Sequence, residues 1–329
     1  MLFVDNANQT DSRLNLALEE HLVKNLAINE ELLLFYINAP SIIIGRNQNT
    51  LEEINTAYVK EHDVQVVRRL SGGGAVYHDL GNLNFSFITP YRPGQPQDFK
   101  HFTQPVIRVL HALGVEAELS GRNDILVDGR KISGNAQYRT ARRMFSHGTL
   151  LFDTQLAGVV AALNVSQSKI TSKGLKSVRN RVANISEFLA EPLTTREFRA
   201  RLLQGIFNHA TEIPTYELTE ADWDEIHRIK AERYDCWEWN YGRSPEFNVQ
   251  HSHRFPAGEV DVRLNIHQGE IQSAKIYGDF LGDGEINDLE QCLIGTRYDR
   301  APLAAALAAL EVSTYFGGVT REEFLDLIY

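Results

Sequence analysis

Three consecutive glycines, Gly72, Gly73 and Gly74, form the most distinctive candidate for chemistry in this sequence. They lie in the segment RRLSGGGAVYHD, which begins at Arg68. Because glycine has no Cβ, backbone N–H groups can converge there on an anion. The guanidinium of Arg69 adds paired donors suited to phosphate or carboxylate. The pattern therefore predicts an anion-binding loop, although a plain hairpin loop is the alternative for the glycines taken alone.

The glycine loop does not match either common phosphate-binding motif. A Walker A loop needs the pattern GxxxxGK[ST] followed by a helix. A dinucleotide fingerprint also needs a following helix, whereas the residues after this loop, LNFSFI (83–88), predict a strand. The loop is therefore expected to bind its anion in another structural setting.

A lysine follows a predicted β-turn in the segment ILVDGRKISG, residues 125–134. Asp128-Gly129 between two β-like runs is a strong signal for a two-residue hairpin, so Lys131 should open the returning strand. There its ammonium group could be held near a phosphate or carboxylate, and a solvated lysine beside a turn is the alternative. Asp124, just before the hairpin, is a candidate Mg²⁺ ligand, because this ion favours one or two carboxylates plus substrate phosphates.

A further group of cations occurs at residues 169–181, KITSKGLKSVRNR. Its glycine, serine and threonine residues favour a loop. Such a loop could order over a nucleotide phosphate when ligand binds, could help dock an acidic partner, or could be a solvated charged surface. A histidine at position 147, in the predicted strand 144–153, is by itself more typical of a structural role.

The composition excludes several classes of protein. The net charge of −10 argues against a general nucleic-acid binder. No apolar run reaches the roughly 18 residues of a membrane helix, and the N-terminus lacks the pattern of a secretory signal. The only two cysteines, Cys236 and Cys292, do not suggest a disulfide framework and are best explained as small apolar residues. A cytoplasmic protein, monomeric by default, is expected.

Periodicity and turn residues predict a fold that mixes helices and strands. Ser12 can cap the first helix, which carries Leu14, Leu18 and Leu22 on one face. The remaining expected helices span 52–62, 98–113, 155–163, 195–208, 221–233, 285–293 and 301–311. The expected strands span 32–38, 41–47, 64–70, 83–88, the two arms of the 125–134 hairpin, 144–153 and three antiparallel segments after about residue 247.

The charge distribution predicts a small C-terminal domain. Residues 250–329 contain six Lys or Arg against thirteen Asp or Glu, a net of −7, so the rest of the chain is nearly neutral. The segment 240–248, NYGRSPEFN, has the glycine, proline and polar content of a linker. We therefore expect a large α+β domain over 1–246, with a mixed sheet flanked by helices, and a small α+β domain over 247–329.

Four segments, in this order and spacing, resemble the lipoate–protein ligase A family: RRLSGGGAVYHDLGN, GRNDILVDGRKISGNAQ, HGTLLF and SVRNRVANI. The resemblance extends over nearly the whole chain and includes a C-terminal accessory domain. It implies a catalytic domain related to biotin–protein ligases. It also implies two half-reactions: lipoate and Mg-ATP give lipoyl-AMP and pyrophosphate, and the acyl group then passes to a lysine of a lipoyl domain. The implied acceptors are lipoyl domains of 2-oxoacid dehydrogenase E2 subunits or the glycine-cleavage H protein.

The resemblance also implies roles for individual residues. Arg69 matches a nucleotide-contacting arginine, and Lys131 matches a lysine that touches both the lipoate carboxyl group and the phosphate. The residues matching a loop that lines the adenylate and the lipoyl tail are Gly74, Ala75, Val76 and Tyr77. The residues in the same motifs with less defined roles are Ser71, Gly72, Gly73, Asn123, Asp124 and His147.

Other functions stay open from the sequence. A transferase of the same superfamily that works through a cysteine thioester would need an activated cysteine, and neither cysteine lies near a motif. A biotin ligase would carry a GRGRRG-like loop, which is missing from this sequence. A non-catalytic protein that binds lipoate or lipoyl domains is the third alternative, and the retained Lys131 and glycine loop weigh against it.

Overall fold

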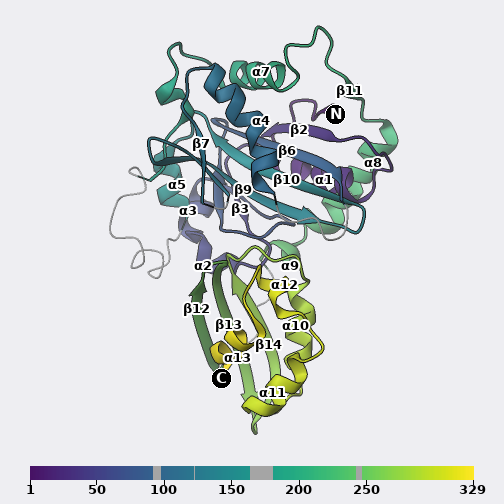
Figure 1. The fold of residues 1–329 in the computed structure, drawn as a ribbon, viewed down its shortest axis with the longest axis vertical. Helices are drawn as coiled ribbons and strands as arrows, with labels where there is room; N and C mark the ends of the chain where they lie inside the picture. Colours follow the sequence, from purple (N-terminus) through teal and green to yellow (C-terminus); the bar gives the residue numbers. More distant parts are fainter. Residues whose placement is uncertain (92–97, 122, 164–180, 242–246) are drawn as a thin grey trace. The chain divides into compact units, whose positions relative to one another are not determined.

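The computed structural model describes residues 1–91, 98–121, 123–163, 181–241 and 247–329, and it divides into two compact units (Figure 1). The larger unit contains Met1–Ile43, Leu51–Val67 and Val76–Asn240. The smaller unit contains Tyr241–Tyr329 and two short segments from early in the chain, Ile44–Thr50 and Arg68–Ala75. The glycine loop therefore clusters with C-terminal residues, and the domain boundary expected after residue 246 stays a prediction.

A mixed eight-stranded sheet forms the centre of the larger unit, in the order β11-β1-β2-β6-β10-β9-β8-β7. The strands are β1 (Leu2–Asp5), β2 (Leu32–Ile37), β6 (Asn82–Pro90), β7 (Glu118–Ser120), β8 (Asp124–Val127), β9 (Arg130–Arg139), β10 (Arg143–Leu151) and β11 (Thr215–Tyr216). Strand β1 runs parallel to β2 and β11, and the other neighbours are antiparallel. The α+β class with a mixed sheet is therefore confirmed.

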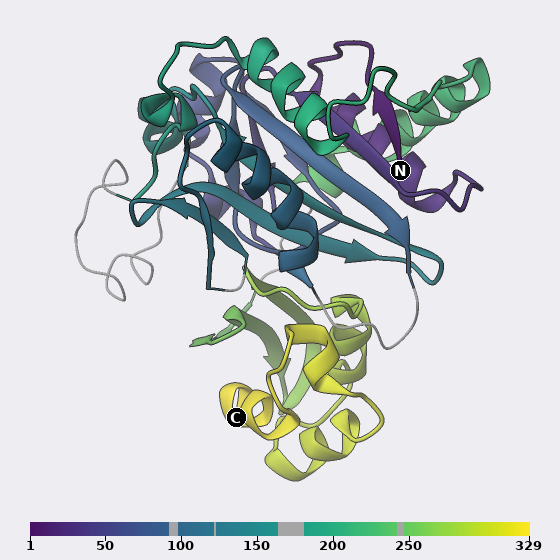
Figure 2. The same cartoon turned by 45° about the horizontal axis from the view of Figure 1, so that its top comes forward.

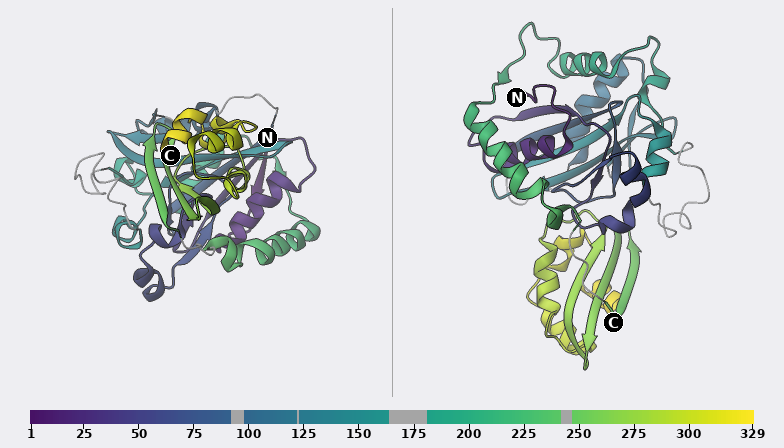
Figure 3. Two further views of the ribbon diagram at one scale, coloured as in Figure 1. Left: turned by 90° about the horizontal axis from the view of Figure 1, so that it is seen from below. Right: turned by 180° about the vertical axis from the view of Figure 1, so that it is seen from behind.

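Helices cover both faces of this sheet (Figures 2 and 3). Helices α4 (Phe99–Ala112) and α7 (Thr195–Ile206) pack on one face, where apolar residues form a large buried core. Helix α1 (Ser12–Lys24) lies on the other face, and α8 (Glu220–Ile229) packs against α1. Because alternate residues of a strand point to opposite faces, each strand supplies one row of side chains to each layer.

The two faces differ in chemistry because of this alternation. On β6, Phe85 and Phe87 point into the apolar core under α4 and α7. Ser86, between them, points to the α1 face and pairs across the sheet with His147 of β10. The α1 face of the sheet therefore carries polar side chains that are nevertheless buried.

A smaller sheet, β4 (Gln65–Arg68), β3 (Ser41–Ile44) and β5 (Val76–His78), leads into and out of the glycine loop. The order is β4-β3-β5, so the strand before the loop and the strand after it both pair with β3. Helix α5 (Leu156–Ala162) packs on β5 and on α3 (Thr56–Glu61). This arrangement fixes both ends of the loop.

The smaller unit is built on the antiparallel sheet β12 (Val249–Phe255), β13 (Gly258–His267) and β14 (Glu270–Gly278). Helices α10 (Ile286–Leu293), α11 (Arg300–Leu307), α12 (Val312–Phe316) and α13 (Arg321–Ile328) cover it and enclose a separate apolar core. The three expected C-terminal strands are confirmed. The helices α12 and α13 were not expected from the sequence.

Several local predictions were wrong in detail. The helix expected over 52–62 is two short helices, α2 (Thr50–Glu53) and α3. The side chain that caps α1 belongs to Asp11, which accepts from the N–H of Arg13, because Ser12 is already helical and bonds Gln65. The helix expected over 221–233 becomes a π-helix, η3 (Lys230–Tyr234), after α8. The short elements β1, β5, β7, β11, η2 (Ile185–Phe188) and α9 (Trp237–Asn240) were also missed.

Only the end of the basic run lies among the described residues. Of its cations, Arg181 is described, and Lys169, Lys173, Lys176 and Arg179 lie outside the described residues. No described helix has the length and apolar character that a membrane span requires.

Candidate active site

The glycine loop is organised around the buried side chain of Arg69. Its Nε donates to Ser71 Oγ at 3.0 Å, and its Nη2 donates to the carbonyl oxygens of Gly72 at 2.6 Å and Gly74 at 2.9 Å. Two carbonyls of the loop are therefore satisfied by Arg69. Among the described residues, no hydrogen-bond partner is present for the N–H groups of Gly72, Gly73 and Gly74. Because buried or half-buried N–H groups normally find an acceptor, this loop is suited to an external anion.

Each of the three glycines meets a different environment. A Cβ on Gly72 would lie 2.6 Å from the carbonyl oxygen of Phe280, so this glycine permits close backbone contact. Gly73 has φ of 91°, a region that side chains rarely adopt. A Cβ on Gly74 would meet nothing within 4 Å. Packing and backbone conformation therefore account for Gly72 and Gly73, but nothing within the described protein requires glycine at position 74.

The other arginine of the motif, Arg68, has a structural role. Its Nη1 donates to the carbonyl oxygens of Gly45, Arg46 and Gln48, and its Nη2 donates to Thr50 Oγ1. Burial lowers the pKa of Arg68 to about 10, which still leaves the guanidinium charged at neutral pH. Arg68 therefore fixes the segment 45–50 beside the glycine loop.

The residues after the loop are mostly held within the fold. Ala75 and Val76 are partly buried, and Tyr77 is buried with its ring 3.3 Å from the position of a Cβ on Gly158. Burial, with Tyr58 and Asp79 nearby, raises the pKa of Tyr77 to about 12, so its hydroxyl stays protonated at neutral pH. Tyr77 therefore packs toward α5 and α3.

The hairpin that carries Lys131 has the geometry expected from its sequence. Asp128 and Gly129 have φ of 50° and 73°, as a two-residue turn of the primed type requires. Beyond the turn, the N–H of Lys131 donates to Arg181 O at 2.7 Å, and its carbonyl accepts from Ala183 N at 3.0 Å. The backbone of Lys131 is therefore paired on both sides, which fixes where its side chain starts.

The ammonium group of Lys131 lies 2.8 Å from Asp124 Oδ1, and both side chains are more than a third exposed. The register shift between Ile125 and Leu126 leaves Lys131 opposite Leu126 and Gly134 opposite Asp124, so Lys131, Asp124 and Gly134 share one face of the β8–β9 pair. Gly134 provides the space, because a Cβ there would lie 2.9 Å from Lys131 Nζ. The structure thus brings together two of the expected site residues, and sequence analysis missed Gly134, which accommodates them.

Asn123 has a clear local function. Its Nδ2 donates to Asn135 O at 2.6 Å, while its own carbonyl accepts from Asn135 N and Nδ2. This three-bond exchange ties the start of β8 to β9. Asn123 therefore supports the hairpin that presents Asp124 and Lys131.

His147 is buried on the α1 face of the sheet. Its Nδ1 lies 3.0 Å from both carboxylate oxygens of Glu19 on α1, and its ring lies 4.6 Å from that of Phe145. Glu19 is 2% exposed, so this is a buried ion pair or a strong hydrogen bond, depending on the proton. Sequence analysis did not single out Glu19, although a charged residue among the apolar positions of an amphipathic helix is a usable signal.

Comparisons with known proteins identify the family. Residues 11–207 match the family model of the lipoyl protein ligase A/B catalytic domain, and residues 244–328 match that of the bacterial lipoate protein ligase C-terminus. The chain is 59% identical over 331 residues to lipoate-protein ligase LplJ of Bacillus subtilis, with 100% of both chains covered.

Two solved structures are also similar. One is LipL1 of P. falciparum in complex with lipoate, with a TM-score of 0.79 and 26% identity over 99% of this chain and 97% of that one. The other is lipoate-protein ligase A bound with ATP, with a TM-score of 0.60 and 28% identity over 74% of this chain and 97% of that one. The matched models cover both parts of the sequence, so the chain belongs to the lipoate–protein ligase family.

Proposed function

We propose that this protein activates lipoate with ATP and transfers the lipoyl group to a lysine of an acceptor protein. The family membership supports this reaction, and one structural observation carries it to particular residues. The glycine loop turns the carbonyls of Gly72 and Gly74 toward Arg69 and leaves three successive N–H groups without a described partner. Such a set of donors suits the phosphate of an adenylate.

In the first half-reaction, two anions have to approach each other. The carboxylate of lipoate attacks the α-phosphate, and the leaving group is pyrophosphate, so no protein nucleophile is required. The ammonium of Lys131 offsets the repulsion between the two anions, and the N–H groups of the loop stabilise charge that develops on the phosphate. Arg69 acts by holding the loop in shape, since its described hydrogen bonds go to the loop itself.

Asp124 is the residue we assign to Mg²⁺. Among the described residues, no group of three or more histidine, cysteine or acidic side chains could hold a metal by itself. A single exposed carboxylate fits Mg²⁺ delivered with nucleotide phosphates, because that ion needs only one or two protein ligands. The ion would neutralise phosphate charge, and Lys131 would then exchange part of its contact with Asp124 for the substrate.

In the second half-reaction, the acceptor lysine attacks the mixed anhydride and releases AMP. We propose lipoyl domains of E2 subunits or the glycine-cleavage H protein as acceptors. A cytoplasmic location and a monomeric state also stay proposals. The remaining loop positions, Ser71, Ala75 and Val76, are proposed to line the adenylate.

A thioester mechanism receives no support from either cysteine. The Sγ of Cys236 lies 3.1 Å from the carbonyl oxygen of Glu232, as a thiol donating back to the end of η3 would. Burial raises the pKa of the Cys292 thiol, which disfavours the reactive thiolate. An acyl-transferase with a cysteine intermediate would need the opposite shift.

The direct test mixes the protein, Mg-ATP, lipoate and an apo lipoyl domain. Mass spectrometry should find one lipoyl group on the acceptor, and pyrophosphate should appear only when lipoate is present. The variant Lys131→Ala should lose both signals, whereas Lys60→Ala, at an exposed lysine, should behave as wild type. Full lipoylation by Lys131→Ala would refute the role of this lysine, and acceptor labelling without ATP would refute the ligase reaction.

A further inference from the structure

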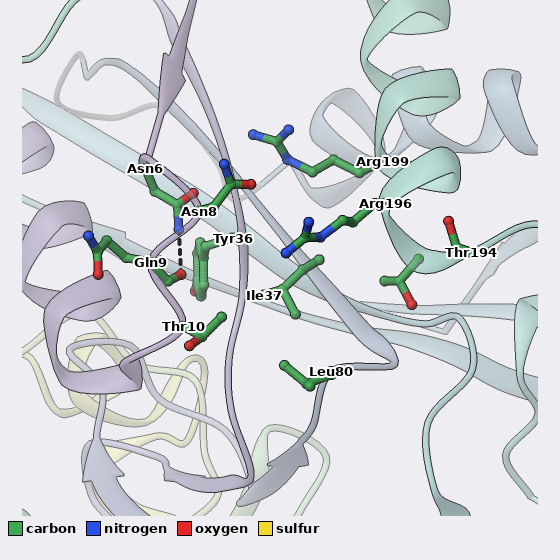
Figure 4. A pocket seen from close by; sticks show the side chains of 11 residues that line it. Asn6, Asn8, Gln9, Thr10, Tyr36, Ile37, Leu80, Thr194, Arg196 and Arg199 are labelled. Carbon is green, nitrogen blue, oxygen red and sulfur yellow. Dashed lines mark hydrogen bonds between the residues drawn. The ribbon is translucent and has the colours of Figure 1, made fainter.

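A cavity in the larger unit is lined by residues outside the glycine loop and the Lys131 hairpin. It encloses about 340 Å³, which is the lower end of the range for small-molecule sites. Its walls come from three segments: the turn after β1, the end of β2 with Leu80, and the first turns of α7 (Figure 4). Nothing in the proposed ligase reaction uses these residues.

Two arginines give this cavity a positive charge. Arg196 and Arg199 occupy successive turns of α7, and both extend toward the turn that carries Asn8 (Figure 4). No acidic residue is in the lining set, although the chain as a whole has a net charge of −10. Two arginines without a carboxylate in the lining favour an anionic occupant, even though Asp5, just outside the lining, pairs with Arg199.

The two guanidinium groups differ in their contacts with the rest of the protein. Arg199 contacts Asp5 Oδ1 at 3.3 Å, and its guanidinium carbon lies 5.4 Å from the ring centre of Phe3. These contacts position it in advance. Arg196 has no ion-pair partner among the residues that the structure describes, so its charge is available to a ligand.

The opposite wall is polar, and its residue Asn6 is buried. Asn6 lines the cavity and begins a buried chain of side-chain hydrogen bonds: its Nδ2 donates to Asn15 at 2.9 Å, and Asn15 donates to Asn38 at 2.9 Å. Asn38 Nδ2 in turn donates to His78 Nδ1 at 3.0 Å, since an amide nitrogen can only donate. Asn6 is therefore already held in place before binding, which favours affinity.

Apolar groups complete the cavity. Ile37 is partly buried, and Leu80 is 59% exposed at the rim, one of the few large apolar side chains exposed in the described chain. An inorganic ion would gain nothing from them. We propose that this cavity binds a small organic anion, with its carboxylate or phosphate group between Arg196 and Arg199 and its apolar part against Ile37 and Leu80.

Calorimetric titration with four probes, without lipoate or ATP, tests this inference independently of ligase activity. Benzoate and phenyl phosphate represent organic anions with the two head groups, and acetate and inorganic phosphate lack the apolar part. We expect at least one organic probe to bind about tenfold more tightly than its small counterpart. The head group of that probe then identifies the chemistry of the ligand.

Variants assign the binding to this cavity. Arg196→Ala should weaken the organic probe by roughly tenfold or more, as expected for the loss of a charge-assisted hydrogen bond. Arg201→Ala, an exposed arginine of the same helix outside the lining, is the matched control and should bind as wild type. Arg196 is exposed and unpaired, so its removal should leave the fold intact. Absence of binding up to about 10 mM, equal binding by both variants, or equal affinity for organic and inorganic probes would overturn the proposal.

Discussion

Replacing Gly134 by alanine should separate the placement of Lys131 from the stability of the fold. A Cβ at this position would lie 2.9 Å from Nζ and 3.0 Å from Cε of Lys131, whereas ordinary contact begins at 3.4 Å. The ammonium must therefore move by about 0.5 Å or rotate away from Asp124. A misplacement of 1 Å at a reacting centre can cost about 100-fold in rate, so we expect roughly a tenfold loss in kcat/KM.

Stability should hardly change in the same variant. The atoms that the new methyl group meets are the end of a flexible, partly exposed side chain, which can move at little cost. An exposed ion pair such as Lys131–Asp124 contributes about 0–1 kcal/mol, and alanine in a strand is favoured over glycine by about 0.5–1 kcal/mol. These two effects offset each other, so the free energy of unfolding should stay within about 1 kcal/mol of wild type.

The matched control is Gly148→Ala on the neighbouring strand. Its Cβ would lie 2.1 Å from Asn135 Oδ1 and 2.6 Å from Phe85 Cζ, and both side chains are buried. Overpacking of this kind costs typically about 1–3 kcal/mol. Thermal unfolding and lipoate-dependent pyrophosphate release measure the two effects. Wild-type kinetics in Gly134→Ala would refute the idea that Lys131 must be held at this point, and equal destabilisation of both variants would refute the packing analysis.

Three other tests, which use four variants, address separate features of the structure. Gly74→Ala should leave the melting temperature unchanged, because its Cβ meets open space. The same variant should bind ATP more weakly if a nucleotide approaches this backbone. Gly72→Ala should unfold at a lower temperature, because its Cβ would meet a backbone oxygen at 2.6 Å. The double variant Cys236→Ser/Cys292→Ser should keep lipoylation activity, since the proposed reaction forms no thioester. Asp222→Asn should reduce the decrease in the free energy of unfolding that occurs as the pH is lowered.

The direction of the pH effect expected for Asp222→Asn follows from the hydrogen bonds of Asp222. Burial pushes the pKa of this carboxyl up, but hydrogen bonds from Thr219, His21 and Tyr216 together hold it below its usual value. A lowered pKa stabilises the fold above the unfolded-state pKa, and this contribution is lost as the pH falls through the folded-state pKa. Urea unfolding of wild type between pH 5 and pH 3 should show the loss. If the free energy of unfolding of Asp222→Asn falls with pH as steeply as that of wild type, this assignment is contradicted.

Controls for the other two tests are equally direct. Nucleotide affinity of Gly74→Ala equal to wild type would indicate that position 74 is glycine for no reason connected with ATP. Acceptor labelling that disappears in the cysteine double variant, in a protein that still folds, would favour the thioester mechanism.

Local structure was largely readable from the sequence. The turn at Asp128-Gly129 has few solutions, because two successive residues with positive φ between β-like runs define one type of hairpin. Amphipathic periodicity also located α4 and the C-terminal strands. These features depend on neighbouring residues, and for that reason sequence patterns predict them well.

Sequence analysis failed where one residue had to choose among several structural partners. Two adjacent arginines, Arg68 and Arg69, look equivalent in sequence, yet one fixes segment 45–50 and the other fixes the glycine loop. The helix expected over 52–62 broke into two at Asn55, whose N–H and side-chain amide donate to the carbonyls of Ala162 and Ala161. Local propensity does not decide such cases, since the competing hydrogen bonds come from distant residues.

The sequence by itself determined the family and the side chains available for chemistry, because four motifs in this order are already specific. Only the tertiary structure decided that Glu19 contacts His147 across 128 positions, that Gly134 makes room for Lys131, and that a cavity with two arginines exists on α7. The physical reason is that these features depend on side chains brought together by sheet register and helix packing. Neither is encoded in the spacing of residues within any one segment.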